Sequence, residues 1–229
     1  MTKINIQNLS VNYGFDCVLN NINLTTDEGE FIVIVGKSGC GKTTFLNALA
    51  NFIPFIGNVE VPSKKGMIFQ QHSIFPWMTV SENILFGIEN LERKEDILED
   101  LLQITNLKKQ RSKYPSMLSG GQIQRVALAR SIAPSPELLL MDEPFGALDY
   151  YTRAKMQEWL LKFWLKYKIT IIFVTHDIEE AIFLGDKIFV LDEGKLKEEI
   201  KIPFLRPRLP QIRFSAKFNE IRKDILNNF

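Results

Sequence analysis

The residues at positions 36–43 have the types and spacing of a phosphate-binding loop. They read GKSGCGKT, follow an apolar run at 31–35 and precede a helical pattern. Glycines at the ends of this loop let backbone N–H groups turn inward without obstruction, and the helix that begins there adds the positive end of its dipole. Lys42 would supply a charge for the β- and γ-phosphates, and the Thr43 hydroxyl would ligate Mg²⁺. The loop therefore predicts a nucleotide site, and a merely flexible turn is disfavoured because the whole motif is present.

Two carboxylates, Asp142 and Glu143, follow a second apolar run and could complete such a site. In an open parallel sheet, ligands bind beyond the carboxyl ends of the strands. Asp142 suits a Mg²⁺ ligand that acts through the water shell of the metal, and Glu143 would polarise the attacking water. The competing interpretation, a strand-end pair that simply faces solvent, is disfavoured by the phosphate loop.

A histidine, His176, ends a further apolar run, IIFVTHD. A lone histidine is often structural, but this one is expected at the same end of the same sheet. We therefore expect its ring to reach the γ-phosphate as a hydrogen-bond donor rather than as a base.

The second half of the chain alternates continuous apolar runs with helical patterns, which indicates a parallel sheet covered on both faces. Strands are expected at 31–35, 138–141, 170–174 and 187–191, and helices at 152–167 and 178–183. Residues 3–35 show short strands broken by turns. The fold class is therefore α/β.

A mostly helical segment separates the first strand–helix unit from the rest. Residues 81–107 have apolar side chains at three-to-four spacing, which predicts an amphipathic helix. A second helix is expected at 119–132, where the prolines at 134 and 136 end it. A short helix is expected at 218–226, near the C-terminus.

The composition is that of a globular domain, with 45% hydrophobic and 24% charged residues. The net charge of +1 gives no long-range field that would recruit nucleic acid. The two cysteines, Cys17 and Cys40, are too few for a disulfide framework and indicate a reduced compartment. Cys40 lies in the phosphate loop near a helix N-terminus, so we expect a lowered thiol pKa there. The apolar runs are all well short of the ~20 residues of a spanning helix, so any action at a membrane would require docking on other subunits.

The segment Leu118-Ser119-Gly120-Gly121-Gln122, followed by IQRVALARSI, resembles the signature sequence of ATP-binding cassette (ABC) proteins. The other cassette motifs occur in the order of that family along nearly the whole chain. They are Tyr13, where an aromatic ring stacks on adenine, Gln70 of the Q-loop, Asp149 of the D-loop and His176 as the switch histidine.

This resemblance implies the ABC ATPase fold, in which a P-loop NTPase core with a mostly parallel sheet carries an N-terminal antiparallel β subdomain and an inserted α-helical subdomain. The whole chain, 1–229, would be one such domain. Its core and β subdomain would span about 1–70 and 136–205, its helical subdomain about 71–135, and a C-terminal extension 206–229.

The resemblance also implies ATP and Mg²⁺ as cofactors and assigns roles by position. Catalytic roles are implied for Lys42, Gln70, Glu143 and His176, and contacts to the metal for Thr43, Gln70 and Asp142. Nucleotide contacts are implied for Tyr13, Gly36, Lys37, Ser38, Gly39, Cys40, Gly41, Lys42, Thr43, Thr44, Ser119, Gly120, Gly121, Gln122 and Asp149.

The signature turn implies that the molecule works as a pair. A glycine-bearing turn at a helix start is an anion site built from backbone amides, here with the Ser119 hydroxyl. By resemblance, this turn closes on the ATP held by the phosphate loop of a second, identical ATPase subunit, so that ATP binding drives closure. The other implied partners are transmembrane permease subunits and, indirectly, a substrate-binding protein, with the chain on the cytoplasmic face of the cell membrane as a peripheral subunit.

Four kinds of cassette protein compete: an importer subunit, an exporter cassette, a soluble DNA-repair or chromosome ATPase, and a translation-associated protein. The third usually has a coiled coil between the phosphate loop and the signature, and about 75 residues leave no room for one. The fourth has two cassettes in one chain. An exporter cassette and a soluble non-transport ATPase remain the alternatives to an importer.

The segment FPWMTVSENI and the element Leu205-Arg206-Pro207-Arg208 resemble the nitrate, sulfonate and taurine group of importers. We therefore expect a cassette that powers uptake of a small anion of this kind. In transporter relatives, the region of Phe75, Pro76 and Trp77 receives a short cytoplasmic helix of the membrane subunit, although these aromatic residues could also be core.

Overall fold

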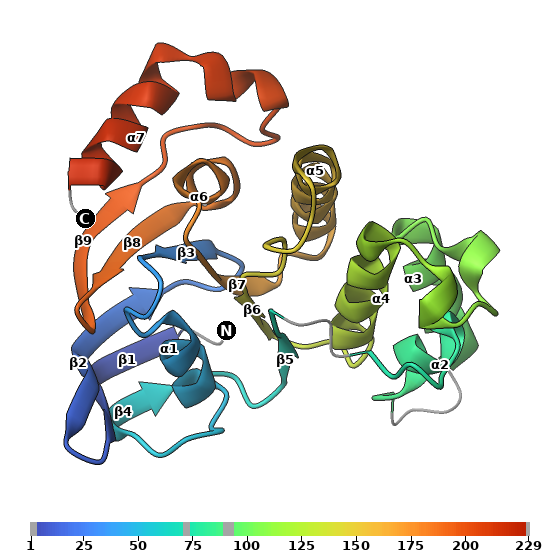
Figure 1. The fold of residues 1–229 in the computed structure, drawn as a ribbon, viewed down its shortest axis with the longest axis horizontal. Helices are drawn as coiled ribbons and strands as arrows, with labels where there is room; N and C mark the ends of the chain where they lie inside the picture. The colour runs from blue at the N-terminus through green and yellow to red at the C-terminus, as the bar shows by residue number, and fades with distance from the viewer. Residues whose placement is uncertain (1–3, 71–73, 89–93, 228–229) are drawn as a thin grey trace.

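A computed structural model of the chain describes residues 4–70, 74–88 and 94–227. An α/β part with two sheets makes up most of the molecule, and a smaller helical part lies beside it (Figure 1). The first sheet has three antiparallel strands in the order β2-β1-β4. Its strands are β1 (Ile4–Tyr13), β2 (Asp16–Thr26) and β4 (Ile56–Glu60).

The second sheet has six strands in the order β5-β6-β7-β3-β8-β9, and all its pairings are parallel except that of β8 with β9. The strands are β3 (Phe31–Val35), β5 (Lys65–Ile68), β6 (Leu138–Asp142), β7 (Thr170–Thr175), β8 (Lys187–Asp192) and β9 (Lys195–Lys201). The parallel sheet and the α/β class expected from the apolar runs are confirmed, and so is the N-terminal antiparallel sheet that the family resemblance implied.

The continuous apolar strands are buried on both faces because different layers cover them. On β3, Phe31, Val33 and Val35 join a hydrophobic cluster that includes residues of the helices α5 (Tyr150–Tyr167) and α6 (Ile178–Leu184). Its alternate residues, Ile32 and Ile34, join a second cluster with α1 (Lys42–Leu49) and the antiparallel sheet. Each such buried side chain contributes roughly 1.5–3 kcal/mol, so the strand that leads into the phosphate loop is firmly held.

The helical part contains α2 (Val80–Leu85), α3 (Lys94–Ile104) and α4 (Gly120–Ile132), which Figure 1 shows together at one end of the molecule. The bounds of about 71–135 that the resemblance implies for a helical subdomain stay a prediction. The long helix expected at 81–107 is wrong as a single element. α2 ends at Leu85, and Phe86 and Gly87 follow in a turn, because glycine is a poor helix former.

The C-terminal segment returns to the α/β part. Helix α7 (Ala216–Asn227) lies beside α6, and Arg222 of α7 forms an ion pair with Glu179 of α6 at 2.8 Å. Three short 3₁₀ turns complete the described structure, at Lys108–Gln110, Pro115–Met117 and Pro210–Phe214. Across the described ranges, every helix is too short or too polar to span a membrane.

Candidate functional site

The phosphate loop joins β3 to α1, and its glycines are required by close packing. A Cβ atom on Gly36 would lie 2.5 Å from both the Cys40 sulfur and the Leu191 carbonyl oxygen. Gly41 has a φ of 106°, and a Cβ there would meet the Leu19 side chain at 2.8 Å. Larger residues at these two positions would therefore displace the loop.

The Lys42 side chain is 6% exposed relative to a fully accessible residue, and three oxygen atoms of its own chain surround it. Its Nζ donates hydrogen bonds to the carbonyl oxygens of Gly36 at 2.8 Å and Lys37 at 2.9 Å. A Glu143 carboxylate oxygen lies 3.4 Å away. The ammonium group is thus fixed over the loop, where it can act as a charge for bound phosphates.

Glu143 connects the loop to the next strand. Its second carboxylate oxygen lies 2.8 Å from His176 Nδ1, so one side chain contacts both Lys42 and His176. The backbone of Glu143 has a φ of 41°, a left-handed conformation that costs about 1–2 kcal/mol in a non-glycine residue. Its N–H still donates to the Val174 carbonyl at 3.1 Å, so the neighbouring strand β7 holds this unusual backbone.

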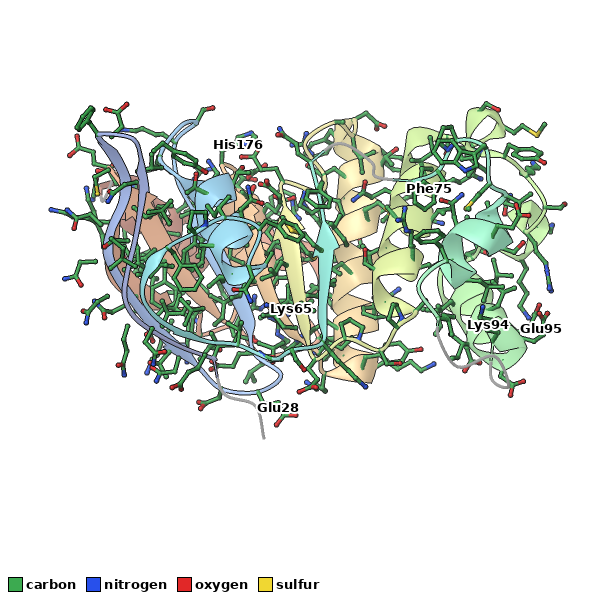
Figure 2. All side chains as sticks on the ribbon, turned by 90° about the horizontal axis from the view of Figure 1, so that it is seen from below. Glu28, Lys65, Phe75, Lys94, Glu95 and His176 are labelled. Atoms are coloured by element: carbon green, nitrogen blue, oxygen red, sulfur yellow. The ribbon has the colours of Figure 1, made fainter. Side chains whose placement is uncertain are left out.

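The carboxyl ends of the strands bring these side chains together, as the sequence predicted. Figure 2 shows His176 at one edge of the molecule and Glu28, which precedes β3, at the opposite edge. β6 ends at Asp142 and β7 ends at Thr175, directly before Glu143 and His176 respectively.

Asp142 is buried beside Thr43 and offers oxygen atoms of the kind that Mg²⁺ prefers. Burial raises the pKa of its carboxyl group, and the hydrogen bond with Thr43 opposes that shift. In the part of the chain that the structure describes, no group of three or more His, Cys, Asp and Glu side chains could hold a metal. A hydroxyl and one carboxylate suit an ion that takes its remaining ligands from water and phosphate, so these residues fit Mg²⁺.

A cleft of about 230 Å³ lies over the loop. Its lining residues are Val18, Ser38, Gly39, Gly41, Lys42, Thr43, Thr44, Gln70 and Glu143. Gln70 therefore reaches the same cleft as the phosphate loop. Sequence reasoning missed Val18, whose contribution depends on the way β2 crosses the loop and which has no chemical signal in the sequence.

The remaining expected nucleotide contacts lie outside this cleft. Tyr13 is 51% exposed at the end of β1, beside the hairpin at 14–15. Asp149 caps α5, because its side chain accepts a hydrogen bond from the Thr152 N–H at 3.0 Å. Neither side chain lines the cleft formed by the described residues of this chain.

The signature turn, residues 119–121, begins helix α4 away from the cleft lining. Ser119 and Gln122 form a capping box, in which the Ser119 N–H donates to Gln122 Oε1 at 3.0 Å. Ser119 and Gly120 are exposed, whereas Gly121 is buried, and a Cβ on Gly121 would lie 2.8 Å from the Thr152 methyl group. The turn is therefore exposed at its tip and tightly packed at its base.

The expectation of a lowered pKa at Cys40 is wrong. Burial raises the pKa of the Cys40 thiol, and the Lys42 charge offsets only part of that effect. The side chain packs against the apolar cluster beneath α1. In this position the loss of solvent outweighs the helix N-terminus, which was the basis of the expectation.

A cluster of aromatic residues lies in the helical part. The Phe75 ring contacts the rings of Phe86 and Trp77, with centroid distances of 4.5 and 5.3 Å. The Arg130 guanidinium lies 4.1 Å from the Phe75 ring centroid, and Trp77 is 68% exposed. Figure 2 places Phe75 in the half of the molecule away from the sheets.

Asn83, which sequence reasoning missed, holds this cluster in place. Its side chain is fully buried. It accepts a hydrogen bond from the Phe75 N–H at 2.7 Å and donates to the carbonyl oxygens of Phe75, Met78 and Thr79, each at 3.0 Å. A buried asparagine with this many backbone partners fixes a loop. No signal in the sequence indicated this role, because Asn83 follows two other polar residues in the same short helix.

Comparisons with known proteins agree with this geometry. The family described as "ABC transporter" matches residues 19–146, more than half of the chain. An ABC transporter ATP-binding protein of Methanocaldococcus jannaschii is 42% identical, over 98% of this chain and 90% of its own length. An aliphatic sulfonates import ATP-binding protein of Bacillus cereus is 42% identical, over 93% and 88%. A taurine import ATP-binding protein of Escherichia coli O157:H7 is 41% identical, over 89% and 86%.

Two similar solved structures show cassettes of the same fold. A dimeric bacterial ABC transporter cassette has a TM-score of 0.75 and 32% identity, and the match covers 88% of this chain and 100% of that one. A post-hydrolysis dimer of a cassette bound to ADP and phosphate has a TM-score of 0.73 and 31% identity, with the same coverage. With a phosphate loop, a strand-end glutamate and a signature helix in one fold, this chain belongs to the ABC transporter family, as one of its ATP-hydrolysing cassettes.

Proposed function

We propose that this ABC ATPase powers the import of a small anion of the sulfonate, taurine or nitrate type. The observation that carries the proposal is the match along nearly the full length to relatives named for sulfonate and taurine import. An exporter cassette and a soluble ATPase are the alternatives. The cassette itself would not touch the cargo, which the permease and a substrate-binding protein would select.

In the proposed site, Lys42 and the loop amides bind the phosphates of ATP. Thr43, Gln70 and Asp142 would hold Mg²⁺, which neutralises charge on the β- and γ-phosphates. Support for this set comes from the cleft, which Thr43 and Gln70 both line, and from the hydrogen bond between Thr43 and Asp142.

Glu143 would accept a hydrogen bond from the attacking water and orient it toward the γ-phosphorus. His176 would donate a hydrogen bond to a γ-phosphate oxygen as charge develops there. The contacts of Glu143 with both Lys42 and His176 support this arrangement, because they place His176 beside a carboxylate that lines the cleft.

We propose further that two such chains form a homodimer with two ATP molecules between them. The Ser119-Gly120-Gly121 turn would bind the ATP held by the phosphate loop of the partner, with Tyr13 and Asp149 near the same interface. The exposed tip of this turn and the dimeric state of similar cassettes support the arrangement. ATP binding would then close the pair, and loss of phosphate would let it open.

The aromatic cluster of Phe75, Trp77 and Phe86 is the proposed docking surface for a permease helix. An exposed tryptophan beside a cation–π pair is a composition enriched at protein interfaces. Docking there would place the chain on the cytoplasmic face of the membrane as a peripheral subunit.

The test is reconstitution with the permease subunits that co-purify with this chain and with their substrate-binding protein. Proteoliposomes should take up labelled taurine or nitrate only when ATP is supplied on the cassette side. Trp77→Ala should lower uptake while the ATPase activity of the isolated cassette stays unchanged. Export of the cargo would favour the exporter alternative, and failure to co-purify with any membrane subunit would favour the soluble one.

A further inference from the structure

A series of buried hydrogen bonds links the C-terminal segment to the strand end that carries His176. The Thr175 hydroxyl donates to Glu180 Oε2 at 2.6 Å, and the Gln157 amide donates to Glu180 Oε1 at 2.8 Å. Arg213 in turn donates to the Gln157 side-chain oxygen. Glu180 and Gln157 are 4% and 2% exposed, so these contacts are shielded from solvent. The series joins β7, α6, α5 and the 3₁₀ turn at Pro210–Phe214.

The same bonds hold both neighbours of His176. The Thr175 hydroxyl accepts from the Asp177 N–H at 3.0 Å, and therefore its own proton is directed to Glu180. The Glu180 N–H donates back to Asp177 Oδ1 at 3.1 Å. The His176 side chain itself is 60% exposed and contacts Glu143. Its direction thus depends on the backbone on either side of it, which Glu180 fixes.

Burying the carboxyl group of Glu180 costs free energy that a purely structural role would not require. Burial raises its pKa to about 7, and the hydrogen bonds from Thr175 and Gln157 oppose that effect. The charges nearest to it act in opposite senses, since Asp177 raises the pKa and Arg153 lowers it. A well-packed apolar side chain in its place would be as stable or more so, but it could not hold Thr175 and Gln157 in a fixed geometry.

The C-terminal segment also grips α6 directly. The buried Arg208 donates to the carbonyl oxygens of Ile182 at 3.1 Å, Phe183 at 3.0 Å and Gly185 at 2.7 Å, which lie at the end of α6. The Arg213 guanidinium lies 4.4 Å from the Phe183 ring centroid. The segment therefore contacts both the helix that carries Glu180 and the glutamine that orients it.

We propose that Glu180 is a positioning residue for His176, and that Arg213 acts on Glu180 through Gln157, so that the C-terminal segment sets the geometry at the γ-phosphate end of the site. This inference rests on the proposed role of His176 in ATP hydrolysis. It gives the segment after residue 205 a part in catalysis, although none of its described residues lines the cleft.

The first test is Glu180→Gln in the full-length chain, assayed for ATP hydrolysis. The new amide can still accept the Thr175 proton, but it presents a donor to the Gln157 donor, so one hydrogen bond is lost. We expect kcat to fall about tenfold while the KM for ATP changes less than about twofold. Glu179→Gln is the matched control on the same helix. It removes only the exposed ion pair with Arg222, and its kcat should equal that of the wild type.

Arg213→Leu tests the outer end of the series without touching the buried carboxyl group. We expect a smaller fall in kcat, about threefold, again with little change in KM. Arg222→Leu is its control, because Arg222 also joins the C-terminal part to α6 but through Glu179 at the surface. If both arginine variants lose the same activity, the specific route through Gln157 is overturned.

The combination with His176→Ala separates positioning from general destabilisation. If Glu180 acts through His176, Glu180→Gln causes no further loss of turnover in the His176→Ala background. If the two losses multiply instead, or if Glu180→Gln lowers only the melting temperature, the inference is overturned. Should His176→Ala alone leave turnover unchanged, the proposed role of His176 fails, and that result is seen without any change at Glu180.

Discussion

The two glycine turns of the molecule, at the starts of α1 and α4, differ in how complete they are. The phosphate loop is built by the chain itself, since Lys42 is buried and bonded to two loop carbonyls and Gly36 has no room for a side chain. The signature turn is exposed at Ser119 and Gly120. The phosphate loop is thus a complete site within one chain, whereas the signature turn leaves its tip open to solvent.

Helix capping shows the same difference. No side chain caps the N-terminus of α1, where Gly41 stands, so its amides are directed to the loop. At α4 the Ser119 hydroxyl already accepts a hydrogen bond from the Gln122 N–H, at 3.4 Å. A phosphate can bind at the N-terminus of α1 without displacing a side-chain cap. At α4 it would have to compete with the Ser119 cap, whose hydrogen bond is long and therefore weak. We therefore expect the two turns to be used in sequence, with ATP bound first at the phosphate loop and the signature turn engaged second.

Of the variants considered, Glu143→Gln should change turnover most, because it removes the carboxylate that we propose orients the attacking water while both turns stay intact. We expect turnover to fall about 10²- to 10⁴-fold, with ATP affinity nearly unchanged. The ATP-bound variant should be a stable dimer in light scattering. A variant that stays monomeric with ATP and turns over normally would contradict both the mechanism and the shared use of one ATP.

Separate variants of the two turns should separate binding from hydrolysis. Lys42→Ala should weaken ATP binding about 10- to 100-fold, because a charge-assisted contact is lost. Ser119→Arg should leave ATP binding to the single chain within about twofold but lower turnover about a hundredfold, because the exposed tip is blocked.

Equilibrium binding of a fluorescent ATP analogue and steady-state hydrolysis would measure both effects. If Ser119→Arg reduces ATP binding as strongly as Lys42→Ala does, the division of roles between the two turns is wrong.

The pH dependence of stability should distinguish the α6 face of the sheet, which carries the buried carboxyl group of Glu180, from the α1 face. Its pKa is about 7 in the folded chain and 4.5 as a free group, so between these values the folded state keeps a proton that the unfolded state has released. Stability from this group is therefore present below pH 4.5 and lost as the pH rises to 7. Relative to Glu180→Gln, the wild type should lose up to ~3 kcal/mol over this range. Urea unfolding at pH 5 and pH 8 would measure this loss. If the free energy of unfolding changes equally between the two pH values in both proteins, the prediction is refuted.

The smallest expected effect is on the labelling rate of Cys40, which reports how accessible the phosphate loop is before ATP binds. Cys40 is half-buried with a raised thiol pKa, whereas Cys17 is exposed. Maleimide labelling should therefore modify Cys40 about tenfold more slowly than Cys17, and ATP should slow it further. Peptide mapping with Cys17→Ser as the control would measure the rates, and faster labelling of Cys40 would show that the loop opens.

The strands and the loop could be predicted because their signals are local. Continuous apolar runs define β3, β6 and β7, and the rule that ligands bind beyond strand ends then brings Lys42, Glu143 and His176 together. The pKa of Cys40 could not be predicted, because its burial depends on packing against residues distant in the sequence. Likewise, the contacts of Val18 and Asn83 depend on backbone positions, which residue types do not encode. The break after α2 was missed because apolar spacing outweighed the single Gly87.

The left-handed backbone of Glu143 has a consequence for evolution in the laboratory. Glycine adopts this conformation without strain, so Glu143→Gly should relieve the chain of a local distortion while removing the carboxylate that we propose orients the attacking water. Selection for expression or heat resistance alone would accept such a change, and the products would be robust but inactive. Any screen for more stable variants of this enzyme must therefore measure turnover and folding together.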